Sequence, residues 1–317
     1  MASKPNDPER PTVLITGCSA GSAGNALALE FAARGFRTFA TGRSKEAVSN
    51  LEERGIETFI VDVTVPESIT KLKDDIARLT GGTLNVLFNN AGASNHNSRD
   101  APDIIKVYEA PAIEADRARV RGLFDTNVFG LFDMVQAFTP LLLAAVPMSK
   151  QPPTIVNTAS VLARLPSPFS SAYNATKAAI ASYSDTLRLE VEPLGLKVVT
   201  LYMGEVSTAL MSAGNINFGP DSIYADVEYK VKERSMKHEK TTMSPVEFAG
   251  QVVRALEGSG NNYIWKGTNA FVVWLLDAVG GRKVFDRIMK SPAGLSDTKL
   301  RDKIYQKGQA QHGQSAK

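Results

Sequence analysis

The chain has 317 residues, of which 43% are hydrophobic, and this length accommodates one large α/β domain or two small ones. Its 36 basic and 33 acidic residues give a net charge of only +3, which argues against a nucleic-acid-binding protein. The single cysteine, Cys18, excludes an internal disulfide, and three widely spaced histidines indicate no metal site.

Residues 1–10 are polar and rich in proline, and we expect them to form a flexible N-terminus rather than a secretory signal. We find no run of about 18 apolar residues that would be needed to cross a bilayer. A single cysteine fits a reducing compartment. These features together predict a cytoplasmic protein.

Short β-branched stretches alternate with helical stretches between residues 11 and 297. The expected strands cover residues 12–16, 36–41, 58–63, 84–88, 154–158, 197–202 and 262–264. The expected helices cover residues 25–34, 69–79, 119–143, 172–192 and 245–256, with a shorter helix around Val48 and Leu51. This alternation is typical of a parallel sheet with helices on both faces. We therefore predict a single α/β domain with a doubly wound, Rossmann-type sheet.

A glycine-rich loop joins the first expected strand to the first expected helix and contains Gly17, Ser19, Gly21 and Gly24. In this position, small residues let the backbone approach a pyrophosphate, and the helix N-terminus favours its negative charge. The loop predicts a dinucleotide cofactor. The alternative is a tight turn without a ligand.

The residues after the second expected strand indicate which dinucleotide binds. An acidic residue there would favour NAD by binding the ribose 2′-hydroxyl, but this chain has Thr41, Gly42 and Arg43. The Arg43 guanidinium can bind a 2′-phosphate through two hydrogen bonds. We therefore predict NADPH as the cofactor, with a solvated surface arginine as the alternative.

Tyr173 and Lys177 are four residues apart in a stretch expected to be helical, which places both on one face. A cation about 4 Å from the phenol supplies roughly 4 kcal/mol at an effective dielectric of about 20. Lowering a tyrosine pKa by about three units from its usual value near 10 costs about the same free energy. The pair therefore predicts a proton donor whose pKa lies near neutrality. The alternative is a packed tyrosine beside a solvated lysine.

The glycine-rich loop, the segment Asn89-Asn90-Ala91-Gly92 and the Tyr173–Lys177 pair together resemble the short-chain dehydrogenase/reductase family over about residues 11–260. The resemblance implies a catalytic tetrad, whose members here are Asn127, Ser160, Tyr173 and Lys177. It also implies the cofactor contacts. Asp62 would meet the adenine, Asn89 and Ala91 would border its ribose, Val206 and Thr208 would contact the nicotinamide carboxamide, and Lys177 would hold the nicotinamide ribose.

The chain departs from the family pattern at two places. Gly24 lies one residue later than the usual third glycine of the loop, and Met203-Gly204 replaces the common Pro-Gly. Fungal 1-acyl-dihydroxyacetone-phosphate reductases, which use NADPH, have a similarly lengthened loop, and the chain resembles this subgroup. Family members commonly pair the helices that correspond to residues 119–143 and 172–192, so the resemblance implies a homodimer or homotetramer.

Two segments are candidates for shaping a substrate pocket. Residues 207–240 lie where the family has its substrate lid, and their mixture of apolar and polar residues predicts a hydrophobic carbonyl substrate. Residues 93–116 form an insertion that either contributes to the pocket or is a surface loop.

The C-terminal part has two further features. Residues 270–276 are apolar and are flanked by tryptophans and basic residues, which suits a core or lid helix or, alternatively, peripheral contact with an intracellular membrane. Residues 298–317 are polar, and we expect them to form a mobile tail.

The sequence thus predicts an NADPH-dependent reductase that acts on the carbonyl group of a hydrophobic, lipid-like or secondary-metabolite molecule, with Tyr173 as proton donor. One alternative is an alcohol dehydrogenase that works in the oxidative direction. Others are an NADPH-binding sensor or scaffold without catalysis and a non-redox enzyme on the same fold.

Overall fold

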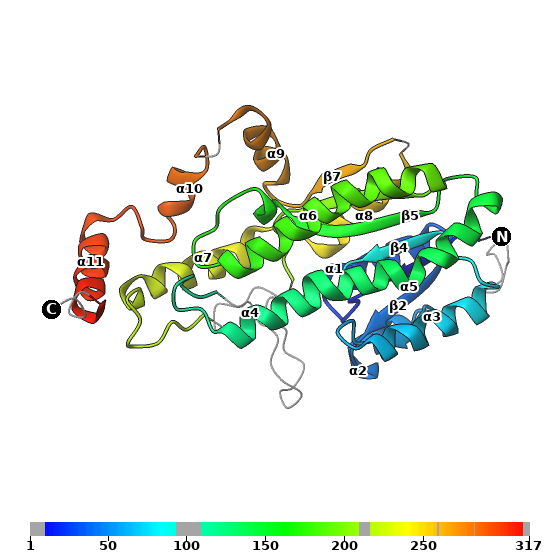
Figure 1. The fold of residues 1–317 in the computed structure, drawn as a ribbon, viewed down its shortest axis with the longest axis horizontal. Helices are drawn as coiled ribbons and strands as arrows, with labels where there is room; N and C mark the ends of the chain where they lie inside the picture. Colours follow the sequence, from blue (N-terminus) through cyan, green and yellow to red (C-terminus); the bar gives the residue numbers. More distant parts are fainter. Residues whose placement is uncertain (1–9, 93–108, 209–215, 259, 282, 313–317) are drawn as a thin grey trace.

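A seven-stranded parallel sheet forms the centre of the molecule (Figure 1), in the strand order β3-β2-β1-β4-β5-β6-β7. The computed structural model describes residues 10–92, 109–208, 216–258, 260–281 and 283–312. The strands are β1 (Thr12–Ile15), β2 (Arg37–Gly42), β3 (Glu57–Ile60), β4 (Val86–Asn89), β5 (Thr154–Ser160), β6 (Lys197–Met203) and β7 (Tyr263–Lys266). The prediction of a doubly wound α/β domain is confirmed.

Helices cover both faces of this sheet (Figure 1). The helices of the described residues are α1 (Ala23–Ala33), α2 (Lys45–Glu52), α3 (Pro66–Thr80), α4 (Arg117–Phe124), α5 (Gly130–Ala145), α6 (Ser171–Val191), α7 (Glu228–Thr241), α8 (Pro245–Glu257), α9 (Ala270–Val279), α10 (Asp286–Lys290) and α11 (Thr298–His312). Of these, α3, α5 and α6 cover one face of the sheet, and α1, α2 and α8 cover the other. A π-helical turn, η1 (Asp125–Phe129), joins α4 to α5. Short 3₁₀ turns include η3 (Val161–Ala163) and η6 (Ala225–Val227).

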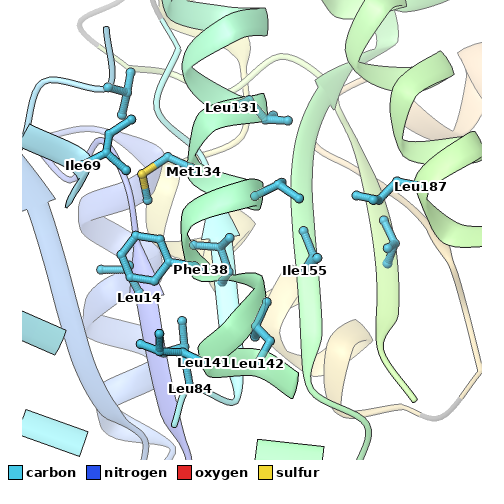
Figure 2. Packing of buried hydrophobic residues seen from close by; sticks show 14 of the residues in the cluster. Leu14, Ile69, Leu84, Leu131, Met134, Phe138, Leu141, Leu142, Ile155 and Leu187 are labelled. Atoms are coloured by element: carbon cyan, nitrogen blue, oxygen red, sulfur yellow. The ribbon is translucent and has the colours of Figure 1, made fainter. Parts of the chain in front are cut away.

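The two faces of the sheet have separate apolar cores because side chains alternate along each strand. On β1, Leu14 points into the core formed with α3, α5 and α6, whereas Val13 and Ile15 point into the core formed with α1, α2 and α8. Figure 2 shows the first core, where Met134 and Phe138 of α5 lie against the sheet. Both cores contain fully buried apolar side chains, so helix packing stabilises the sheet on each of its two faces.

The helical run Arg117–Met148 differs from the sequence expectation in its apolar character. It is apolar and long enough to cross a bilayer by length and composition, which the search for apolar runs missed. Half of its most apolar window is buried, however, and α5 packs in the core against β1 and β5. Its apolar character is therefore explained by its packing on one face of the sheet beside α3.

The C-terminal residues are the clearest correction to the sequence prediction. The expected mobile tail forms α11 instead. Leu300 and Ile304, four residues apart, pack against the small core around Val227, and Lys303 and Lys307 form ion pairs with Asp226 at 3.3 and 2.6 Å. The polar composition concealed this narrow apolar stripe. The N-terminal residues 1–9 and the end of the tail, 313–317, lie outside the described residues.

Phe138→Ala tests whether the core around α5 supports the fold. Phe138 is fully buried, so its truncation should lower the free energy of unfolding by about 3–5 kcal/mol. Urea denaturation followed by circular dichroism measures this change. Val246→Ala is the matched control because that side chain is 72% exposed, and it should change stability by less than about 0.5 kcal/mol. Equal effects of the two substitutions would contradict the assignment of the core.

Candidate active site

The carboxyl ends of the central strands gather the residues that the sequence singled out. The strand order reverses between β1 and β4, and ligands of open parallel sheets bind at such a reversal. Thr16 follows β1, Asn89 ends β4, Ser160 ends β5 and Met203 ends β6. The parallel registers of these strands place the four residues along one edge of the sheet.

The glycine-rich loop is fixed against the end of β4. The Thr16 hydroxyl accepts hydrogen bonds from the backbone amides of Asn90 and Ala91 at 3.1 and 2.9 Å. The Asn90 side chain donates to the carbonyl oxygens of Thr16 and Gly17 at 2.9 and 3.1 Å. The loop therefore has a defined shape before any ligand binds.

Two glycines of this loop are required by close backbone approach. A Cβ on Gly17 would lie 2.8 Å from the Cα of Ala91, and the φ of Gly17 is +74°. A Cβ on Gly24 would lie only 2.3 Å from the Gly17 carbonyl oxygen. Gly24 thus packs the start of α1 onto the loop, which explains why a glycine stands at this later position. The Ser22 hydroxyl caps α1 by accepting from the Asn25 amide at 3.1 Å.

The remaining candidates for cofactor binding lie around the same edge of the sheet. The backbone amide of Cys18 donates to the carbonyl of Thr41 at 2.7 Å, which joins the loop to the end of β2. Arg43, just beyond, is exposed and pairs with no other described residue. The Asp62 carboxylate accepts from the amide and hydroxyl of Thr64 at 2.9 and 2.7 Å. Ser19 and Gly21 lie in the loop itself, and Val206 and Thr208 follow β6.

Three buried polar atoms near this edge lack hydrogen-bond partners among the described residues. They are the hydroxyls of Thr41 and Thr158 and the side-chain oxygen of Asn89. The side-chain nitrogen of Asn89 donates to Asn157 at 2.9 Å. Unpaired buried polar groups are costly, so they commonly mark places where a ligand or water completes the hydrogen bonding. The cradle of glycines and these atoms fit a dinucleotide.

The catalytic candidates converge on one point of the sheet edge. Tyr173 and Lys177 lie one turn apart on α6, with the Lys177 ammonium nitrogen 5.7 Å from the centre of the Tyr173 ring. A Cβ on Gly92 would lie 3.5 Å from that nitrogen and 3.6 Å from the side-chain oxygen of Asn127. The Ser160 side chain lies close enough to the Tyr173 phenol to oppose the rise of its pKa. All four tetrad candidates therefore surround the ends of β4 and β5.

Ser160 and Asn127 are held by further contacts. The Ser160 hydroxyl accepts from the Leu162 amide at 3.1 Å and donates to the Met203 carbonyl at 3.3 Å. Asn127 is buried, and its amide nitrogen donates to the Thr176 hydroxyl of α6 at 3.1 Å. It lies in the π-helical turn η1, an irregularity that is frequent at functional sites. The sequence predicted a regular helix here.

The electrostatics of the Tyr173–Lys177 pair differ from the sequence prediction. Burial raises the pKa of Tyr173 to about 12, although the Ser160 side chain opposes the rise. Burial also lowers the pKa of Lys177 to about 8. The ammonium group donates to the Thr158 carbonyl at 2.8 Å, and its charge lies by the ring. The expectation that Lys177 brings the Tyr173 pKa towards neutrality is therefore wrong in this structure, because burial dominates.

Two features beside the site were missed by the sequence reasoning. Phe169, four residues before Tyr173, has a φ of +70°, which is rare for a bulky residue and is often found at functional sites. Its ring packs against Phe218 and Tyr224 of the expected lid, with centroids 5.0 and 5.5 Å away. The apolar part of the lid segment thus meets the residues that lead into helix α6. Residues 209–215 of the lid segment lie outside the described residues.

The second missed feature is a buried ion pair between Glu109 and Arg234. The two side chains are 2.6 Å apart and each is 8% exposed. The Ser170 hydroxyl, at the start of α6, donates to the same Glu109 carboxylate at 3.1 Å. Burial raises the pKa of Glu109 against the opposing effect of Arg234. The pair connects Glu109, near the end of segment 93–116, with helix α7 and the start of helix α6. Residues 93–108 lie outside the described residues.

Comparison with known proteins places this arrangement in context. A family model described as short chain dehydrogenase matches residues 11–217. The short-chain dehydrogenase virD of Hypocrea virens is 35% identical over 275 residues, which cover 86% of this chain and 89% of that protein. The NADPH-dependent 1-acyldihydroxyacetone phosphate reductase of Schizosaccharomyces pombe is 40% identical over 200 residues, which cover 63% of this chain and 61% of that protein.

A solved structure agrees with the fold. The crystal structure of a short-chain dehydrogenase from Streptomyces avermitilis superposes with a TM-score of 0.70 at 26% identity, covering 90% of this chain and 99% of that chain.

Gly24→Ala tests the close packing of the loop. The added methyl group would overlap backbone atoms that cannot move without opening the loop, so we expect a loss of about 1–3 kcal/mol of unfolding free energy. Gly250→Ala in α8 is the control, since its nearest neighbour is a flexible side-chain atom 3.9 Å away. That substitution should leave stability unchanged or raise it by up to about 1 kcal/mol. Thermal and urea denaturation measure both, and a harmless Gly24→Ala would refute the packing argument.

Proposed function

The chain belongs to the short-chain dehydrogenase family, and from that premise we propose that it is an NADPH-dependent reductase of a hydrophobic carbonyl compound. The observation that carries this proposal is the convergence of Ser160, Tyr173 and Lys177 beside the glycine-rich loop. The NADPH dependence named for the Schizosaccharomyces pombe relative supports the choice of cofactor. The exposed Arg43 at the end of β2 supports it independently.

The proposed cofactor site follows the edge of the sheet. The loop residues Gly17, Ser19, Gly21 and Gly24 would hold the pyrophosphate at the N-terminus of α1. At the adenosine end, Thr41 and Arg43 would lie by the 2′-phosphate, Asp62 would bind the adenine, and Asn89 and Ala91 would border the adenine ribose. At the other end, Val206 and Thr208 would bind the nicotinamide carboxamide, and Tyr173 and Lys177 would bind the nicotinamide ribose. When bound, NADPH supplies the hydride.

Tyr173 completes the reduction as an acid. As the carbonyl carbon gains the hydride, its oxygen gains negative charge and takes the phenolic proton, so the products are an alcohol and NADP⁺. A pKa of about 12 keeps the phenol protonated at neutral pH, as this role requires. The Ser160 hydroxyl would hydrogen-bond the same oxygen. The Lys177 charge would stabilise the phenolate that remains, and Asn127 would hold a water that returns a proton.

The same groups serve reduction and oxidation, so the residues of the site do not set the direction. We propose reduction because the Schizosaccharomyces pombe relative is named as an NADPH-dependent reductase. The contact of Phe169 with Phe218 and Tyr224 supports an apolar lid, and hence a hydrophobic, lipid-like or secondary-metabolite ketone. We keep the non-catalytic sensor as an outcome of the test below.

We also propose a cytoplasmic homodimer or homotetramer, in which α5 and α6 pair with a second copy. Exposed apolar side chains at this face support the proposal. Phe129, just before α5, is 54% exposed and Leu189 of α6 is 60% exposed.

The proposed function is tested with purified protein and a panel of lipid-like, polyketide and steroid-like ketones. NADPH absorbance should fall with at least one of them. Tight NADPH binding without turnover on any ketone, or on any alcohol with NADP⁺, would favour the sensor instead.

Arg43→Asp tests the cofactor preference. The carboxylate would repel a 2′-phosphate but accept a ribose 2′-hydroxyl, so NADPH affinity should fall by about tenfold or more while NADH affinity changes little. Fluorescence titration of both dinucleotides gives the two dissociation constants. Equal losses for both would contradict the role of Arg43.

The pH dependence of reduction tests the role of Lys177. Its pKa of about 8 means that the ammonium loses its proton as the pH rises through that value. Reductive kcat/KM should therefore be level from about pH 6 to 7 and fall above about pH 8. Lys177→Arg stays charged throughout, so whatever rate it retains should not show this fall. A wild-type profile that is flat to pH 10 would be inconsistent with the assignment.

A further inference from the structure

Helix α9 presents its apolar side to solvent. Ala270 and Val273 are buried, but the opposite side of the helix is open. Its exposed side chains are Phe271 (66%), Val272 (52%), Trp274 (42%), Leu275 (42%) and Val279 (75%). A surface helix of a globular domain ordinarily turns its apolar side inward and its polar side to solvent. A contiguous exposed apolar face of this kind marks an interaction surface.

This face is held rigidly. Ala270 and Val273 pack with Val161 of η3 and with Phe285, which anchors α9 beside the sheet. The rings of Phe271 and Trp274 lie 5.6 Å apart, and α9 projects beyond the β7 edge (Figure 1). The apolar side chains are therefore already arranged for contact with a partner.

Positive charge follows the apolar face along the chain. Lys283, Arg287 and Lys290 follow α9 and are exposed. The two acidic side chains of this part are already engaged. Asp277 pairs with Arg164 and Asp286 pairs with Lys290, each at 3.7 Å. Lys283 and Arg287 form no ion pair with another described residue, so their charge is available to an anionic partner.

We propose that α9 and the segment that follows it bind an anionic phospholipid surface. The docking surface comprises Phe271, Val272, Trp274, Leu275, Val279, Lys283 and Arg287. Its apolar side chains would enter the boundary between headgroups and acyl chains, and its basic side chains would meet the lipid phosphates. A tryptophan at the rim suits such a boundary, where one side of the ring system is apolar and the other is wet.

A second copy of the chain is a less suitable occupant. In a two-fold contact the same surface meets itself, so the interface would contain Lys283 and Arg287 from both copies without acidic partners. Like charges brought together in this way disfavour association. An anionic lipid surface instead complements the charge.

The position of this surface relates it to the active site. Val161, against which α9 packs, directly follows Ser160. Docking would therefore bring the strand end that carries Ser160 close to the lipid surface, where hydrophobic ketones dissolve. The docking itself rests on α9 and does not depend on the proposed reaction.

Vesicle co-sedimentation with the full chain tests the proposal. Vesicles of phosphatidylcholine alone and with phosphatidylserine are compared, without NADPH or substrate, so that the outcome is independent of catalysis. We expect binding to the phosphatidylserine vesicles that weakens at high salt. Lys283→Gln with Arg287→Gln should lower it by about 30-fold, from about 1 kcal/mol per basic residue. Phe271→Ser with Trp274→Ser should reduce it at least as much. Val246→Ser, an exposed apolar position on α8, should have no effect.

Tryptophan fluorescence gives a second measurement that does not depend on the stability of these variants. The chain has two tryptophans, and Trp265 is stacked on Tyr202 with centroids 4.0 Å apart. A blue shift on vesicle addition should therefore come from Trp274 and disappear in Trp274→Phe. Absence of wild-type binding or of this shift would overturn the proposal. So would a loss of oligomers, seen by size-exclusion chromatography with light scattering, in Phe271→Ser with Trp274→Ser, because that result would identify a second copy as the occupant.

Discussion

Strand β1 lies between β2 and β4, and the reversal of strand order at this point is the constraint on which the site depends. Parallel strands end at one edge, so the reversal leaves a crevice between the loop after β1 and the loop after β4. Thr16, Asn90 and Ala91 fix these two loops to each other with backbone and side-chain hydrogen bonds. Gly17 and Gly24 fit only because they lack side chains. The apolar cores on either face hold the strands in register and thereby hold the crevice open.

Burial then decides the chemistry at this edge. The same desolvation that raises the pKa of Tyr173 lowers that of Lys177, so the two groups favour an un-ionised phenol beside a lysine that titrates near pH 8. A protonated phenol is the state that a carbonyl reduction consumes. The proposed role of Tyr173 as a proton donor therefore rests on the environment of the pair more than on their spacing along α6.

Much of the fold could be predicted from the sequence because each element has a local signal. The β-branched runs, the glycine-rich loop and the alternation of strands and helices all reflect nearby residues. The π-helical turn at Asn127 had no such signal, since it follows from the packing of η1 on α6. The Glu109–Arg234 pair joins residues 125 positions apart, and the positive φ of Phe169 depends on its surroundings. Helix α11 was missed because two apolar residues in a polar stretch are a weak pattern. The raised pKa of Tyr173 could not be predicted, because it depends on how deeply the side chain is buried and the spacing of Tyr173 and Lys177 does not show this.

The most direct test of the account is single-turnover reduction of an active ketone by Tyr173→Phe, with NADPH binding measured in parallel. Removing only the hydroxyl should lower the rate of reduction by about 10²–10⁴-fold, the usual contribution of a general acid. NADPH affinity should fall by no more than about tenfold, the loss of one hydrogen bond to the ribose, and thermal stability should change little. A variant that keeps the wild-type rate would contradict the assignment of Tyr173 as the proton donor.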